Sequence, residues 1–154
     1  MKKLIFMLLA VVAFCCPVLS QSNFGSIDYL NQNQKYGNIT LGDSITKNLR
    51  KLSLLEEKGN GCFKCSVTEP GEECYKMGGI SPFTAFVDVE SYIIKHVLVY
   101  FKIEEQDIVN KYLIETYGEY SKFSEGSRKW YGKEVLLTAG QSEKAYYVIF
   151  TLAK

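Results

Sequence analysis

The chain has 154 residues, of which 18 are Lys or Arg and 17 are Asp or Glu, so its formal net charge is only +1. The sequence contains no basic stripe of the kind that binding to nucleic acid or to an anionic membrane needs. We therefore expect no nucleic acid among its partners.

The first twenty residues have the pattern of a secretory signal peptide. Lys2-Lys3 is followed by an unbroken apolar run at 4–14, and small or tolerated residues precede Gln21 at the positions that cleavage requires. The apolar run is shorter than the roughly 20 residues that span a bilayer, which argues against an uncleaved anchor. We predict a signal peptide at 1–20 and an exported protein, found in the periplasm, on the cell surface or in the medium.

The rest of the chain predicts a polar arm and one domain. Residues 21–37 are rich in Asn and Gln, with little apolar pattern, and are expected to form an N-terminal polar arm. The chain left after cleavage has about 130 residues, a length at which folding buries about two thirds of the surface. Because no linker or low-complexity segment interrupts residues 38–154, we predict a single domain there.

The first predicted helix covers residues 45–55. Asp43 or Ser44 can cap its N-terminus, and the sequence Gly-Asn-Gly at 59–61 is expected to end it. Its apolar residues recur at helical spacing: Ile45, Leu49, Leu52 and Leu55. This pattern is typical of an amphipathic helix that packs on a core.

Strands are predicted next. Residues 62–68 and 73–77 flank Pro70-Gly71, a pair suited to a type II turn, and so predict a hairpin. Residues 83–89 alternate between apolar and polar, and residues 92–103 form the longest strand candidate.

A second helix is predicted at 105–117, with Gly118 at its C-terminus. Three strands then close the chain, at 128–131, 133–139 and 144–152. The order of elements is a helix followed by strands, stated twice. Short connections favour antiparallel pairing, so we predict an α+β fold in which two helices pack on one face of an antiparallel sheet.

A resemblance rests on glycine turns and aromatic positions. It is carried by these segments: Tyr36-Gly37, Leu41-Gly42, the strand at 92–103, Tyr117-Gly118, Trp130-Tyr131-Gly132 and Val135-Leu136-Leu137. In them the chain resembles small uncharacterised exported proteins of Bacteroidetes-type bacteria. Its element order is also similar to that of β-lactamase-inhibitor-like and outer-membrane assembly-factor-like modules. That second likeness implies a role in binding other proteins, at the level of fold alone.

Three cysteines follow the predicted signal peptide: Cys62, Cys65 and Cys74. The Cys-x-x-Cys pair runs into strand-like sequence, whereas redox catalysis usually places its thiolate at a helix N-terminus. A zinc site would need Cys74 and His96, the only histidine, beside that pair, and this spacing does not fit a structural zinc site. We therefore predict no metal and no cofactor. In the proposed hairpin Cys65 and Cys74 share a face, so we expect Cys65–Cys74 to be the disulfide, if one forms, with Cys62 left as a thiol.

The candidate binding site lies on one side of the longest predicted strand. Alternation along residues 92–103 places Tyr92, Ile94, His96, Leu98 and Tyr100 on the side of the strand opposite to Val97 and Val99. Residues 144–152 are apolar on both sides, and they add Tyr147. Helices on one side only would leave this aromatic face open, and such faces mark interaction sites. The candidate binding residues are Tyr92, His96, Leu98, Tyr100 and Tyr147.

No catalytic constellation stands out, since the chain has no nucleophile elbow and no phosphate-binding loop. We therefore expect a non-enzymatic binding protein whose partner is another protein or an envelope component. Two alternatives stay open. One is a structural or assembly protein of the cell envelope, and the other is a thiol-dependent enzyme that uses Cys62 and Cys65.

Overall fold

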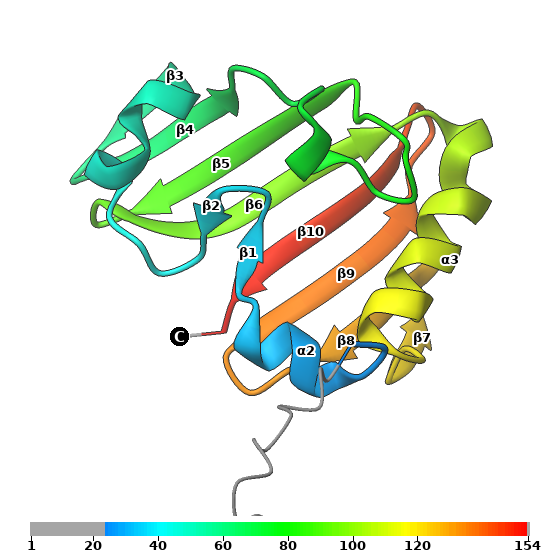
Figure 1. Cartoon of the computed structure of the whole chain (residues 1–154). Helices are drawn as coiled ribbons and strands as arrows, with labels where there is room; N and C mark the ends of the chain where they lie inside the picture. The colour runs from blue at the N-terminus through cyan, green and yellow to red at the C-terminus, as the bar shows by residue number, and fades with distance from the viewer. Residues whose placement is uncertain (1–23, 154) are drawn as a thin grey trace, which may run out of the picture.

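The computed structural model describes residues 24–153, and the predicted signal peptide and its cleavage site lie outside them. The fold is α+β and is dominated by one antiparallel sheet of eight strands in the order β3-β4-β5-β6-β10-β9-β8-β7 (Figure 1). The eight strands are β3 (Leu52–Gly59), β4 (Cys62–Val67), β5 (Thr84–Glu90), β6 (Ile93–Phe101), β7 (Lys122–Ser124), β8 (Ser127–Tyr131), β9 (Val135–Gln141) and β10 (Tyr146–Leu152). The predicted α+β class and antiparallel pairing are confirmed at this level, but the predicted pair of helices on one face and the helix-then-strands order stated twice are not.

The other elements lie on the side of the sheet that faces the viewer in Figure 1. They are α2 (Ile27–Gln32), α3 (Gln106–Tyr117), the small hairpin of β1 (Lys35–Tyr36) and β2 (Ile39–Thr40), and the short 3-10 helices η1 (Ile45–Lys51), η2 (Glu73–Tyr75) and η3 (Ile103–Glu105). None of the helices in the described part of the chain is long and apolar enough to cross a membrane.

The core lies between this layer and the sheet. The sheet contributes alternating side chains such as Val97, Val99 and Phe101, which are fully buried, and α3 adds Val109 and Leu113. Alternation places every second side chain of a strand on the covered face, so the apolar periodicity of β6 settles which side meets the helices. The predicted orientation of Val97 and Val99, opposite to the candidate binding residues, is confirmed.

The first predicted helix is wrong beyond Lys51. Residues 45–51 form the 3-10 helix η1, but the chain then turns into the edge strand β3, which pairs with β4. Gly59, Asn60 and Gly61 all have positive φ and form the turn of that hairpin, so they do not end a helix. The Leu, Glu and Lys residues of this stretch are good helix formers, but intrinsic propensity is a weak determinant of structure, and pairing with β4 overrides it.

The predicted hairpin around Pro70-Gly71 is also wrong. Strand β4 pairs with β3 on one side and with β5 on the other, so no free edge is left for residues 73–77. Residues 73–75 form η2 instead, with Cys74 exposed. The second predicted helix is found as α3, which ends at Gly118 with φ +80°.

Candidate functional site

The face of the sheet away from the helices is not covered by any other element of the described chain. Its side chains are half-buried across four adjacent strands, β5, β6, β10 and β9, and the register places them in rows. One row runs Phe86, Leu98, Ile149 and Thr138, and the next runs Thr84, Tyr100 and Tyr147. We call the surface formed by Phe86, Leu98, Tyr100, Tyr147 and Ile149 the open face. Aromatic and branched apolar side chains therefore meet solvent side by side.

Four of the five candidate residues lie on this side of the sheet. Tyr100 stands opposite Tyr147, and His96 stands opposite Thr151, one row away from Leu98. The Nδ1 atom of His96 lies 3.2 Å from the Thr151 hydroxyl oxygen, so the imidazole is held against its neighbouring strand. The structure thus brings together His96, Leu98, Tyr100 and Tyr147.

Tyr92 lies elsewhere. It belongs to the turn between β5 and β6, and its ring packs 5.6 Å from that of Phe63, centroid to centroid, on the covered side of the sheet. There it borders a mostly apolar groove of about 310 Å³ that η1 forms with β3 and β4. Tyr92 therefore does not share the open face with the other four candidates.

Ile94 was expected to point outward with Tyr92, and this expectation is wrong. The pairing of β5 with β6 shifts between Asp88 and Val89, which leaves Lys95 as the extra residue of a bulge. A bulge reverses the alternation on one side of it, so Ile94 is turned into the core, where it is fully buried.

A hollow at one corner of the open face collects Cys62, Asp88 and His96. One carboxylate oxygen of Asp88 is buried and has no hydrogen-bond partner among the described residues. Lys64, which is paired with Asp88 in the register, places its ammonium 5.1 Å from the centre of the Phe86 ring. The carboxylate of Asp88 is thus left able to accept a hydrogen bond from a bound group.

Cys62, Cys65 and Cys74, the cysteines among the described residues, are free thiols, so the predicted Cys65–Cys74 disulfide is not formed. Cys65 is buried in β4 on the covered face, whereas Cys74 is exposed in η2, because the hairpin that would have joined them is absent. Cys62 lies three residues before Cys65 in the same strand, which turns the two side chains to opposite faces.

The raised pKa of the Cys65 thiol argues against thiol catalysis at this residue. Burial raises the pKa of the Cys65 thiol, and the Asp88 carboxylate raises this pKa further. A catalytic thiol needs a lowered pKa. Within the part of the chain that the structure describes, no three side chains of His, Cys, Asp or Glu are grouped so that they could hold a metal ion.

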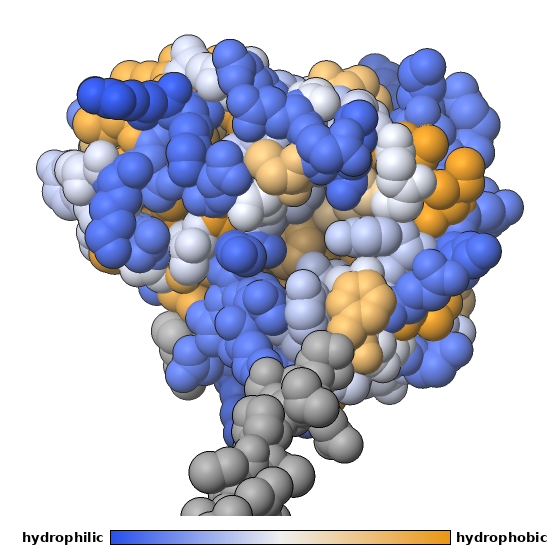
Figure 2. Space-filling model, viewed as in Figure 1, coloured by the Kyte–Doolittle hydropathy of each residue, from blue (hydrophilic) through white to orange (hydrophobic). Residues whose placement is uncertain are grey.

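Sequence reasoning missed a cavity on the helix side. Figure 2 shows a hollow near the middle of this face, with an apolar floor between hydrophilic residues. It has a volume of about 180 Å³ and lies between α2, β1, η2, α3 and β10. Four tyrosines border it: Tyr29, Tyr36, Tyr112 and Tyr117. The abundance of tyrosine was visible in the sequence, but segments so far apart in the chain gave no sign of meeting.

No family model, no curated protein and no solved structure matches this chain.

Proposed function

We propose that this chain is an exported, non-enzymatic binding protein that docks another protein on the open face of its sheet. The observation that carries the proposal is the two adjacent rows of uncovered aromatic and apolar side chains on that face, which include Leu98, Tyr100 and Tyr147. Contiguous apolar patches on a protein surface tend to mark sites of association. Tyrosine suits such sites, because its ring buries a large apolar area and its hydroxyl can still reach a partner.

Polar groups beside the patch would give the interaction its specificity. The unpartnered carboxylate oxygen of Asp88 would accept a hydrogen bond from an amide or a cation of the partner. A wrong partner would leave this oxygen unpaired, which costs about 1–3 kcal/mol. The lack of a lowered thiol pKa at Cys65 supports a binding role over thiol catalysis.

The resemblance to exported proteins of Bacteroidetes-type bacteria and the pattern at residues 1–20 support the proposed export. Mass spectrometry of the protein from its native host would find a mature N-terminus at Gln21. A soluble protein that keeps Met1 would contradict export.

The binding proposal is tested with Leu98→Glu and Tyr100→Glu. Both side chains are half-buried, so the variants should fold, as circular dichroism and thermal unfolding would show. A photo-crosslinking residue at Thr138, beside the patch, would identify the partner in the native cell, and both charged variants should abolish that crosslink. Sedimentation would report whether the partner is a second copy of the chain.

The matched control is Ile108→Glu. Ile108 is an apolar residue of α3 on the other side of the molecule, with 47% of its surface exposed. This variant introduces the same charge and should keep the crosslink. If Leu98→Glu or Tyr100→Glu folds and keeps its partner, the open face is not the docking surface.

A further inference from the structure

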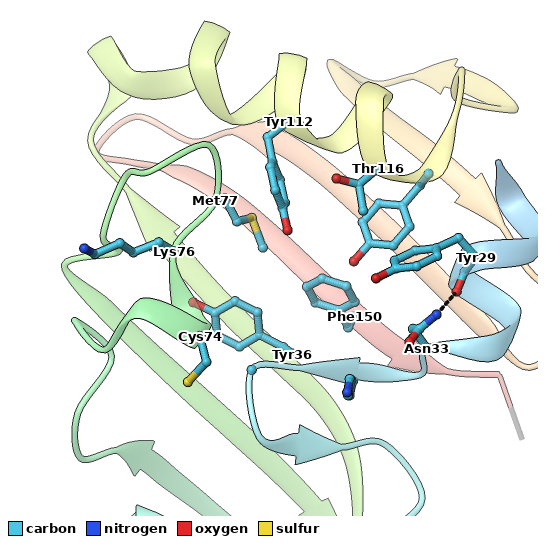
Figure 3. Close-up of a pocket in the computed structure, with 12 residues that line it drawn as sticks. Tyr29, Asn33, Tyr36, Cys74, Lys76, Met77, Tyr112, Thr116 and Phe150 are labelled. Atoms are coloured by element: carbon cyan, nitrogen blue, oxygen red, sulfur yellow. Dashed lines mark hydrogen bonds between the residues drawn. The ribbon is translucent and has the colours of Figure 1, made fainter. Parts of the chain in front are cut away.

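We propose a second binding site, distinct from the open face: the tyrosine-bordered cavity on the helix side takes one uncharged pyranose ring, such as a monosaccharide unit of a glycan. We call it the tyrosine cavity. Residues of α2, β1, η2, α3 and β10 line it, and Figure 3 shows Phe150 of β10 at its floor and Tyr112 of α3 above. This site does not depend on the docking function proposed above.

The size and walls of the cavity fit a single ring. Its volume is about 180 Å³, and an apolar cavity of about 150 Å³ accepts benzene. The ring of Tyr36 is stacked on that of Phe150 at 5.8 Å, and the ring of Tyr117 meets Phe150 edge-on at 6.4 Å, both between centroids. These packed rings make part of the cavity wall aromatic, and the C–H groups of a sugar can pack against such a wall.

One hydroxyl in the wall lacks a partner. Thr116 is 98% buried, and its side-chain oxygen has no hydrogen-bond partner among the described residues, although threonine in a helix commonly bonds to a carbonyl one turn back. Figure 3 shows this hydroxyl on the side of the cavity, next to Tyr112. Buried polar groups are nearly always paired, so an unpaired one at a cavity indicates a bound group or water.

Further polar atoms surround the same space. Burial raises the pKa of the Tyr117 phenol, and the nearby phenols of Tyr112 and Tyr29 raise it further, so the Tyr117 hydroxyl stays protonated and neutral over the physiological range. The side-chain amide nitrogen of Asn33 donates to the backbone carbonyl of Tyr29 at 3.0 Å, which leaves the Asn33 amide oxygen as an acceptor. Several hydroxyls and one amide oxygen thus border one ring-sized space.

The charged residues at the tyrosine cavity favour an uncharged ligand over a cation. Among residues 24–153 no carboxylate borders the tyrosine cavity, while Lys35 and Lys76 do, so the aromatic walls would not hold a cation there. The Lys76 ammonium is paired with Glu73 at 2.6 Å and points away from the cavity in Figure 3. A phenol would engage only one of the hydroxyls, whereas a pyranose carries several around an apolar ring face. A neutral sugar therefore matches both the aromatic and the polar parts of the cavity wall.

The test is a titration of the full mature chain, followed by protein NMR, with methyl glucoside, methyl galactoside, methyl mannoside and N-acetylglucosamine. Phenol and tetramethylammonium are the competing ligands. We expect one of the sugars to bind with shifts centred on Tyr112, Thr116 and Tyr117. Thr116→Val should weaken that binding about 5- to 10-fold. Thr116→Ser, which keeps the hydroxyl, should preserve it, as should the control Thr138→Val on the other side of the sheet.

The stability of the variants separates a ligand role from a structural one. Thr116→Val removes an unpaired buried hydroxyl, so its melting temperature should match or exceed that of the parent chain. Any of four results would overturn the proposal. These are binding of phenol or tetramethylammonium in place of a sugar, no binding of any compound, sugar binding that Thr116→Val leaves unchanged, or loss of sugar binding in Thr116→Ser.

Discussion

The phenol oxygen of Tyr147 lies 2.8 Å from the hydroxyl oxygen of Ser127, two strands away, and the ring reaches it across Gly140 of the strand between them. A Cβ atom at position 140 would stand 2.6 Å from the Tyr147 oxygen and 2.7 Å from the Ser127 oxygen. A glycine at this point therefore fixes how Tyr147 lies on the open face.

Gly140→Ala should break this hydrogen bond. The new methyl group would push the Tyr147 phenol off the strand, and we expect the free energy of unfolding to fall by about 1 kcal/mol. Urea unfolding would measure the change. The control is Gly71→Ala, where a Cβ meets nothing within 4 Å and the backbone is not left-handed. That variant should be neutral or slightly stabilising. Equal effects at both sites would mean that the Tyr147 contact contributes nothing.

The three thiols should differ sharply in reactivity. Cys65 is only 2% exposed and has a raised pKa, so alkylation of the folded protein should modify Cys74 and Cys62 and spare Cys65. Burial raises the pKa of Cys74, and Glu72 raises it further. Glu72→Gln should therefore speed alkylation of Cys74 severalfold near neutral pH, while Glu73→Gln should not. Peptide mapping by mass spectrometry would follow each site, and a recovered Cys65–Cys74 disulfide would contradict the structure.

Tyr146 should make the fold sensitive to alkali. Burial raises its pKa from 10.0 to about 12. Between these values the folded state keeps a proton that the unfolded state loses. The stabilising contribution is thus complete below pH 10 and falls by about 1.4 kcal/mol per pH unit above it.

Tyr146→Phe would isolate this contribution. At neutral pH the variant should lose about 1–2 kcal/mol, because the buried Asn110 side chain loses the phenol that donates to it. Between pH 10 and 12 the difference in free energy of unfolding between the variant and the parent chain should shrink. Denaturant unfolding at several pH values would show it, and parallel stability curves would refute the assignment.

Sequence reasoning succeeded where local pattern and global packing agree. The helix ending at Gly118 and the inward face of β6 follow from periodicities of 3.6 and 2, and both are present in the structure. It failed at β3, where Leu54 and Leu55 are both exposed on an edge strand whose composition suits a helix equally well. Whether such a segment forms a helix or a strand depends on its pairing with residues distant in the chain.

The candidate site was likewise predicted only in part from the sequence. Alternation placed Leu98 and Tyr100 together, but it could not foresee the bulge at Lys95 that turns Ile94 inward. The tyrosine cavity could not be predicted from the sequence, because Tyr29, Thr116 and Phe150 meet only through tertiary packing. No local spacing encodes that contact.

The turn between β5 and β6 has a left-handed backbone at both of its central residues. Ser91 and Tyr92 connect the strands with φ of 52° and 64°, the left-handed pair that a type I′ turn requires and that Asn-Gly satisfies best. At Tyr92 the contact between its ring and that of Phe63 offsets the unfavourable left-handed backbone, whereas the exposed Ser91 side chain makes no such ring contact. Because asparagine tolerates this conformation better than serine, Ser91→Asn should raise the free energy of unfolding by about 0.5–1 kcal/mol, and Ser91→Val should lower it by about 1 kcal/mol. Thermal and urea unfolding of both variants would decide, and the opposite order would mean that this turn is not left-handed in solution.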